Sequence, residues 1–432
     1  MTGFTQSFYW KKIKNTPSEK TSILKNFDKN KYQLFSLNLD NFKILLADVP
    51  SRKNIGSSPM VVINFPDKKG NMEQFQVSET STLAPEIAIK YPNIKTYIGF
   101  SLDNPGGRIR FSISPQGLKT MSTYPNKPAL FTVPLNKGDK SLYISYDRSM
   151  RIDSKKDFEC LTENENVPIK EIISLNRDAN DQILRTLRIA ISTTGEYTNF
   201  WDDGDDTNGD AQEDALAALV STLNRTNEVF EVDMAITFQL VTGTEIIYPT
   251  SSTDPYTGSF NSQLQSTLTS EVGESNYDIG HLFNYGGNNG NAGCIGCVCV
   301  DGQKGSGFSS HSFTDNDGGP NMDDFFDIDY VPHEIGHQMG GNHTFSQSNE
   351  GTGVNYEPGS GTTIMGYAGI TGANDVQDHS DPYFHYGTIN QVLNNLDTRT
   401  CWTSSEITNN PPVADAGDDY TIPQGTAFKL VG

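Results

Sequence analysis

The chain has 432 residues, a formal net charge of -21, a hydrophobic content of 35% and five cysteines. This length predicts two or three domains, each large enough to enclose a core. The acidic balance argues against a nucleic-acid partner, because phosphate binding depends on clusters of Lys and Arg. No apolar run approaches the length of a membrane span. We therefore expect a soluble globular protein with a solvated acidic surface.

The first 180 residues are expected to form a β-rich domain. Short stretches of β-branched and aromatic residues, several of them alternating, are separated by turn signals that contain Gly, Pro, Asn and Asp. This region has no histidine and no catalytic constellation, so its expected role is structural, inhibitory or recognitional. The expected strands are 32–39, 42–49, 60–65, 96–102, 108–114 and 141–146.

A second region follows a polar segment between residues 160 and 185, which is typical of a linker or an exposed cleavage site. Beyond it, the hydrophobic pattern changes from strand to helix and back, which predicts a mixed α/β layer architecture. Asp329 is expected to cap a later helix. The other predicted elements are strands at 187–192, 234–241 and 277–283 and a long helix at 213–231.

The most specific pattern in the chain is H-E-x-x-H-x-x-G-x-x-H, at residues 333–343. On a helix, His333 and His337 are one turn apart, so their imidazoles project from one face toward a common metal ion. Glu334 points past that face, and the glycines after the helix allow a sharp turn that brings His343 round. A single buried histidine is more often a core residue, but five specified positions at fixed spacing predict a zinc site.

A second signature, Thr-Ile-Met-Gly-Tyr at residues 363–367, resembles the Met-turn of the metzincin metallopeptidases. With both motifs in place, residues from about 184 to 401 are similar to bacterial metzincins of the reprolysin-like kind. The resemblance implies a catalytic domain over residues 181–406. Its fold would be α+β (α/β mixed), with a twisted, mostly parallel sheet and an active-site helix.

The same resemblance implies roles for particular residues. Glu334 would be the general base, and Met365 would form the floor of the site. Tyr367 resembles the tyrosine that astacin-like and serralysin-like members use as an additional ligand and transition-state donor, with a packed aromatic ring as the alternative. Eukaryotic reprolysins have Asp where this chain has Thr344, so the subfamily stays open. The implied ligands of one catalytic zinc ion are His333, His337 and His343.

In metzincins the substrate runs antiparallel to an edge strand that precedes the active-site helix. Here that strand would come from residues 290–300. Main-chain pairing of this kind implies extended polypeptide substrates.

Residues 1–180 resemble, more weakly, the propeptide that precedes the catalytic domain in such bacterial enzymes. The Cys160 thiolate would then occupy the open zinc position and hold the enzyme latent, with the propeptide as its own inhibitor. An incidental thiol or a disulfide partner is the open alternative. Arg177 and Arg185 are candidate maturation sites because both lie in the expected linker.

The remaining cysteines are Cys294, Cys297, Cys299 and Cys401. No set at zinc-finger spacing completes a second metal site, so we expect disulfides among these four, with connectivity left open. The acidic run at residues 202–210 does not fit an EF-hand loop and is interpreted as a surface loop, with a calcium site as the minor alternative. The histidines interpreted as structural or surface residues are His281, His311, His379 and His385.

Residues 407–432 begin with a linker and resemble the opening of an immunoglobulin-like or PKD-type β-sandwich. The N-terminus lacks the apolar core of a secretory signal, so the protein either stays inside the cell or has lost its signal. The incomplete C-terminal sandwich favours a protein that has lost its signal, and hence a secreted or cell-surface location.

These features together predict a secreted zinc-dependent endopeptidase in its latent zymogen form. The alternative is an adhesin or binding protein with a vestigial peptidase domain, although such a protein has no need of the intact Glu334. Hydrolysis of a non-peptide amide is less favoured, because this architecture implies a long cleft.

Overall fold

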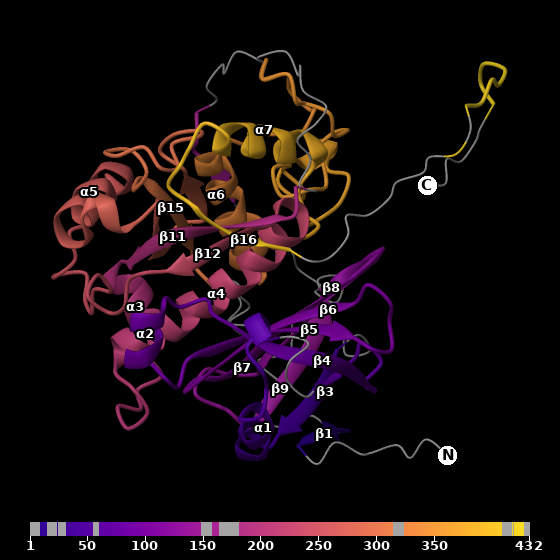
Figure 1. Cartoon of the computed structure of the whole chain (residues 1–432). Coiled ribbons are helices and arrows are strands. Elements are labelled where there is room, and N and C mark those ends of the chain that lie inside the picture. Colours follow the sequence, from indigo (N-terminus) through magenta and orange to yellow (C-terminus); the bar gives the residue numbers. More distant parts are fainter. Residues whose placement is uncertain are drawn as a thin grey trace.

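The computed structural model describes residues 9–14, 24, 32–54, 60–147, 158–163, 181–313, 324–407, 417 and 419–426. Two β-sheets organise these residues, and seven α-helices accompany the sheets within the described ranges (Figure 1). The prediction of a mixed α+β fold is confirmed. Over the same ranges, no helix is both long enough and apolar enough to cross a membrane.

The N-terminal sheet is antiparallel throughout and has nine strands in the order β1-β2-β9-β8-β7-β6-β5-β4-β3. Its strands are β1 (Trp10–Ile13), β2 (Gln33–Leu37), β3 (Val61–Pro66), β4 (Met72–Thr80), β5 (Lys95–Ser101), β6 (Arg108–Ser114), β7 (Gly117–Tyr124), β8 (Lys127–Pro134) and β9 (Leu142–Asp147). Three short helices accompany it: α1 (Leu39–Leu46), η2 (Arg52–Asn54) and α2 (Pro85–Lys90).

The strand predicted at 42–49 is wrong, because α1 covers most of it. The Asn38 side chain accepts a hydrogen bond from the Asn41 amide at 3.0 Å and so caps the helix. Phe42 and Leu46, four residues apart, are the buried residues of this helix. The buried residues of this segment follow the helical period and not the alternation of a strand.

The second sheet is built around β11 and has the order β10-β14-β15-β13-β11-β12, with β16 also pairing with β11. β12, β13 and β15 run parallel to β11, whereas β14 runs antiparallel to β15 and β16 runs antiparallel to β11. β10 pairs with β14 in parallel. Its strands are β10 (Glu159–Cys160), β11 (Ile183–Thr193), β12 (Ile236–Leu240), β13 (Ile279–Tyr285), β14 (Asn289–Asn291), β15 (Gly307–His311) and β16 (Thr403–Glu406).

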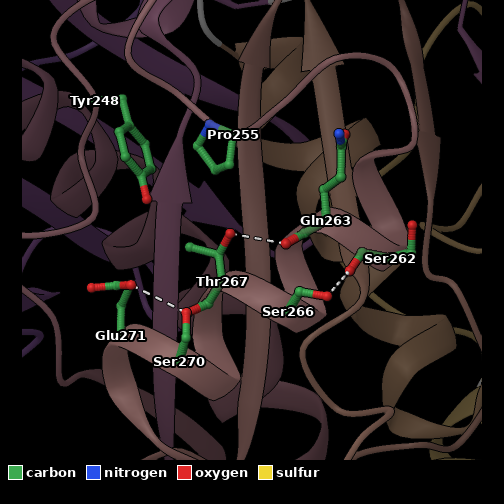
Figure 2. Close-up of a pocket in the computed structure, with 8 residues that line it drawn as sticks. All are labelled: Tyr248, Pro255, Ser262, Gln263, Ser266, Thr267, Ser270 and Glu271. Carbon is green, nitrogen blue, oxygen red and sulfur yellow. Dashed lines mark hydrogen bonds between the residues drawn. The ribbon is translucent and has the colours of Figure 1, made fainter.

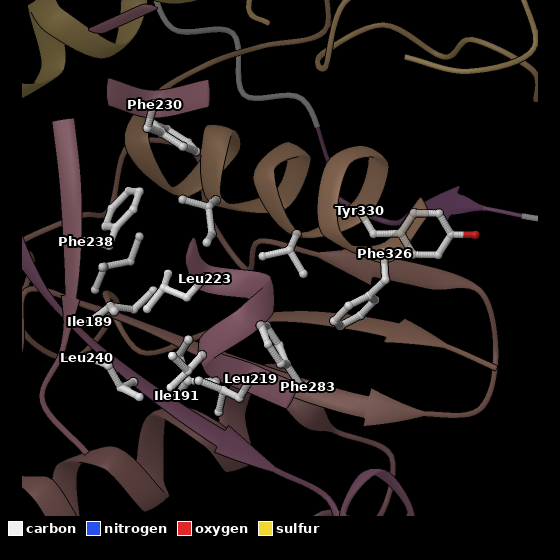
Figure 3. Close-up of a cluster of buried hydrophobic side chains, with 14 of the residues drawn as sticks. Ile189, Ile191, Leu219, Leu223, Phe230, Phe238, Leu240, Phe283, Phe326 and Tyr330 are labelled. Atoms are coloured by element: carbon white, nitrogen blue, oxygen red, sulfur yellow. The ribbon is translucent and has the colours of Figure 1, made fainter. Parts of the chain in front are cut away.

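Helix α4 (Ala211–Met234) is the longest helix described and corresponds to the helix predicted at 213–231. Asp210 and Glu213 form a capping box at its start. One side of α4 packs Leu219 and Leu223 into the largest hydrophobic core, against β11 of the second sheet (Figure 3).

The other side of α4 contacts the N-terminal sheet through buried ion pairs. Arg110 of β6 lies 2.9 Å from Glu228 and 2.6 Å from Glu231. Arg108 also contacts Glu228, at 2.6 Å, and Arg52 contacts Glu231 at 2.5 Å. Helix α4 therefore joins the two sheets, with an apolar contact on one side and a charged contact on the other.

The remaining helices surround the second sheet. The helical segment that carries the histidine motif begins with a π-helical stretch, η6, and continues directly into α6. The helices are α3 (Gly195–Trp201), α5 (Phe260–Thr267), η4 (Leu268–Val272), η5 (Glu274–Asn276), η6 (Phe326–Tyr330), α6 (Val331–Met339), η7 (Gly372–Asn374) and α7 (Tyr386–Leu396).

Two sequence predictions at segment ends are wrong. Asp329 does not cap the motif helix, because it lies within η6, where its carboxylate accepts the Ser380 amide at 2.8 Å. Arg185 does not lie in an exposed linker, since it is a buried residue of β11. Arg177 and residues 164–180 of the predicted linker lie outside the described residues. So does most of the predicted β-sandwich opening at 407–432, which stays a prediction.

Candidate metal centre

Four side chains from two distant segments converge where β10 of the second sheet meets helix α6. Their possible ligand atoms all lie within 4.8 Å of one another, and no other group of this kind is found in the described ranges of the chain. The three histidines are almost completely buried, whereas the cysteine is half-buried. The four residues are Cys160, His333, His337 and His343.

The two helical histidines are oriented by main-chain carbonyl groups. His333 Nδ1 lies 2.7 Å from the Ile364 carbonyl oxygen, and His337 Nδ1 lies 2.8 Å from that of Gly341. Because a carbonyl oxygen only accepts, each Nδ1 is the donor. The Nε2 atom of each neutral ring is then left unprotonated and available as a ligand.

The third histidine is oriented by a carboxylate instead. His343 Nδ1 lies 3.2 Å from the nearer oxygen of Glu350, and its Nε2 lies 3.1 Å from His337 Nε2. Burial, followed by the proximity of His343 and His333, lowers the pKa of His337 well below its ordinary value. A set of neutral imidazole nitrogens with one sulfur fits the tetrahedral donor set that zinc prefers.

The turn signature lies directly below the motif helix. A Cβ atom added to Gly336 would come within 2.6 Å of Met365 Sδ, so the glycine is what allows this methionine to approach the helix. Met365 is fully buried in the core of the second sheet. Gly340 ends α6 with a φ of 119°, a left-handed conformation that favours glycine, and the chain then turns toward His343.

Comparison with known proteins identifies this part of the chain. Residues 183–396 match the metallopeptidase family M12B, reprolysin-like. This segment is a reprolysin-like metallopeptidase domain. Among solved structures, the chain is similar to metalloproteinase-II from Bacteroides fragilis, with a TM-score of 0.45 and 10% identity over 83% of this chain and 95% of that one. No curated protein matches the sequence.

The carboxylate of the motif lies deep in the metallopeptidase domain. Glu334 is fully buried, and burial raises its pKa to about 8, while hydrogen bonds from Thr162 and Cys160 act in the opposite direction. A Cβ atom added to Gly290 would come within 2.5 Å of Glu334 Oε1, so the carboxylate packs closely against β14. A carboxyl group in such surroundings can exchange a proton near neutral pH.

Cys160 reaches the metallopeptidase domain from outside the matched segment. Its strand β10 runs parallel to β14, with Cys160 opposite Gly290, and its Sγ lies 3.6 Å from His337 Nε2. Burial and then the negative charge of Glu334 raise the pKa of the Cys160 thiol well above its ordinary value. A cation among the histidines would favour the thiolate instead.

The other four cysteines form two disulfides, Cys294–Cys297 and Cys299–Cys401. The expectation of disulfides among these four is confirmed, and their connectivity is now assigned. Cys160 is left as the free cysteine of the chain.

Tyr367 lies at the same centre. Its hydroxyl is 3.0 Å from His343 Nε2, and its ring packs on Phe345 with 4.4 Å between the ring centroids. Burial and then the neighbouring Cys160 raise the pKa of its hydroxyl. Tyr367 is therefore protonated at neutral pH and can donate a hydrogen bond into the site.

The edge of the sheet beside the centre differs from expectation. Within residues 290–300, only the end of β14 (Asn289–Asn291) is strand, and the following loop carries the Cys294–Cys297 disulfide.

Two residues at the metal centre are not among those predicted from the sequence. Glu350 lies in an irregular loop with no sequence signal, whereas Thr162 follows Cys160 by two positions and so shares its face of an extended segment.

The other histidines have structural contacts. His281 is buried between Gln338 and Ser309, at 2.9 Å from each, and burial lowers its pKa to about 4. His385 caps α7. His311 accepts the Phe313 amide, and the His379 ring packs on Phe325.

The acidic run at 202–210 is mostly exposed and joins α3 to α4. Its carboxylates accept nearby backbone amides, as Asp205 does from Thr207. The calcium alternative stays untested.

A pocket of about 350 Å³ lies beside α5, away from the metal centre, and its lining includes Tyr248 and Glu271 (Figure 2). Its serine hydroxyls are hydrogen-bonded to carbonyl groups of their own helix, as Ser266 is to Ser262. We do not assign a role to it.

Proposed function

We propose that this chain is a zinc-dependent endopeptidase held in a latent form by its own N-terminal region. The observation that carries the proposal is the position of the Cys160 sulfur, within 4.8 Å of the possible ligand nitrogens of three histidines. In this proposal His333, His337 and His343 hold the zinc ion, and the Cys160 sulfur takes the fourth position. A catalytic zinc site needs that position open, so the arrangement is inactive.

The residues around the zinc ion then have separate tasks. Zinc, when bound, supplies Lewis acidity that polarises a water molecule and the scissile carbonyl group. Glu334 accepts the proton of the attacking water and returns it to the departing amine. The Tyr367 hydroxyl donates a hydrogen bond to the developing oxyanion. Met365 supports the histidines from below and takes no part in proton transfer.

Residues 1–180 act as the propeptide in this proposal. The support is their double contact with the metallopeptidase domain, through the ion pairs on α4 and through β10 at the metal centre. Activity would then require that β10 leaves the cleft. The two disulfides support a secreted or cell-surface location, because such bonds persist in oxidising compartments.

The substrates in this proposal are extended polypeptides. Backbone carbonyl groups at β14 already bind an extended segment, residues 159–161. The Leu161 amide donates to the Gly290 carbonyl at 2.8 Å, and the Glu159 amide donates to the carbonyl of Asn288, just before β14, at 2.9 Å. A substrate strand in place of residues 159–161 would use the same groups. The adhesin alternative receives no support from the family match.

The test compares the zinc-loaded full chain before and after limited proteolysis, with a labelled unfolded protein as substrate. We expect the uncut chain to bind zinc and cleave little, and the processed form to cleave. A chelator and Glu334→Ala should each abolish cleavage, whereas Glu86→Ala, at an exposed position of α2, should not. A processed, zinc-loaded form that cleaves nothing would favour the binding-protein alternative.

A further inference from the structure

The segment that carries Cys160 makes a second contact with the catalytic machinery. The Thr162 hydroxyl donates to Glu334 Oε2 at 2.8 Å, and it accepts the Ala292 amide at the same distance. Thr162 is only 8% exposed, whereas Leu161 between the two inward-facing residues is 40% exposed. Alternate residues of an extended segment face the same way, so Cys160 and Thr162 both point into the site.

We propose that Thr162 is a second inhibitory residue, which holds the general base while Cys160 closes the metal position. This inference rests on the proposed function and concerns the regulation of the same site. Glu334 can serve a water molecule only if its carboxylate is accessible to that water. A hydroxyl bonded to Oε2, on a segment that fills the cleft, denies it that access.

The contact is fixed from both sides. The Ala292 amide orients the Thr162 oxygen so that its single proton points to Glu334. The Asn291 side chain donates to the Leu161 carbonyl at 2.8 Å, next to Thr162 in the chain. Asn291 is in turn held by Asn261 of α5, whose amide lies 3.3 Å from its side-chain oxygen. The segment is thus anchored at consecutive residues on the cleft side.

Two inhibitory contacts on one segment predict a specific pattern of activities. Removal of the thiol alone opens the metal position but leaves Glu334 engaged by Thr162. Removal of the hydroxyl alone frees Glu334 but leaves the metal position closed. Substantial activity of the uncut chain therefore requires both changes. The loss of a hydrogen bond by a buried polar group corresponds to a factor of about ten to a hundred in an equilibrium.

The experiment uses the zinc-loaded full chain and the labelled unfolded protein. In the Cys160→Ala background, Thr162→Val should raise cleavage about tenfold or more. Thr162→Ser keeps the hydroxyl and should not raise it. Thr132→Val removes a buried hydroxyl that bonds to Ser145 in the N-terminal sheet, and it serves as the matched control. The inference would be overturned if the single variant Cys160→Ala and the double variant Cys160→Ala/Thr162→Val cleaved the substrate equally fast.

A second measurement does not depend on activity. In the metal-free chain, the rate at which Cys160 is alkylated reports how often its segment leaves the cleft. Thr162→Val should raise this rate severalfold and Thr162→Ser should not, and an unchanged rate would contradict the inference. Failure of the proposed function looks different, since the zinc-loaded domain would then cleave nothing even after residues 1–180 had been removed.

Discussion

The Arg110 guanidinium of β6 and the Glu228 carboxylate of α4 lie 2.9 Å apart, and neither side chain is more than 2% exposed. Two charges removed from water cost free energy unless they compensate each other. This pair therefore makes the association of the N-terminal sheet with the metallopeptidase domain sensitive to single substitutions.

Arg110→Met should lower the free energy of unfolding by about 3–5 kcal/mol, because it leaves Glu228 buried without its closest fully buried partner. Urea unfolding measures the change. Lys95→Met is the matched control, since the Lys95–Glu79 pair is exposed and should contribute less than about 1 kcal/mol. Equal effects of the two substitutions would contradict the importance of burial.

The same interface predicts a dependence on pH. Burial raises the pKa of Glu228, but the charges of Arg108 and Arg110 outweigh burial and lower it to about 2. A carboxyl group with a lowered pKa stabilises the fold above its ordinary pKa of 4.5, and this contribution is lost as the pH falls toward 2. Urea unfolding of the intact chain and of Glu228→Gln at about pH 7, 4 and 3 should give a difference that shrinks on acidification. A constant difference would disprove this assignment.

Glu350→Gln should weaken zinc binding about 10- to 100-fold, because the carboxylate that orients His343 and increases its basicity is lost. Competition with a chelator measures the affinity directly, without any cleavage assay. Glu271→Gln, beside the pocket at α5, is the control and should leave the affinity unchanged. If both variants bind zinc like the original chain, Glu350 has no part in orienting the ligand.

The two disulfides should differ in their effect on stability. Cys299 and Cys401 are 102 positions apart, whereas Cys294 and Cys297 are three apart. In the chain-entropy account, the long loop contributes about 4–5 kcal/mol and the short loop about 1–2 kcal/mol. Thermal unfolding of the two double Cys→Ser variants measures the effect. Loss of Cys299–Cys401 should lower the unfolding temperature more than loss of Cys294–Cys297, and the reverse result would show that loop entropy does not decide the effect.

The motif residues could be predicted because their geometry is local. His333 and His337 share a helix face through the helical period alone, and Gly340 permits the turn that follows. The helix start could not be predicted in the same way. Asp329 is a residue type that favours a helix cap, but it lies within η6, where it accepts a hydrogen bond from Ser380, 51 positions away. Such a contact leaves no trace in the neighbouring sequence.

Contacts between residues from distant segments are even harder to predict from the sequence. Strand β7 carries polar residues that would suit a solvated face, yet Thr120 is buried where its carbonyl accepts a hydrogen bond from Arg225 of α4. Glu350 reaches His343 from a loop without any periodic pattern. Thr162 is the exception, because an extended segment through Cys160 already implies that the residue two positions on faces the same cleft.

Helix α4 contributes to the surface that would be exposed if residues 1–180 were removed. Its side toward the N-terminal sheet consists of groups that water solvates well, among them Asn224, Arg225, Glu228 and Glu231. Loss of residues 1–180 would expose these hydrophilic groups, and it would also uncover the part of the largest core that Leu83, Ile87 and Phe158 contribute to. The separated domain would therefore present charged groups along α4 beside a newly exposed apolar area, and its solubility would depend on both.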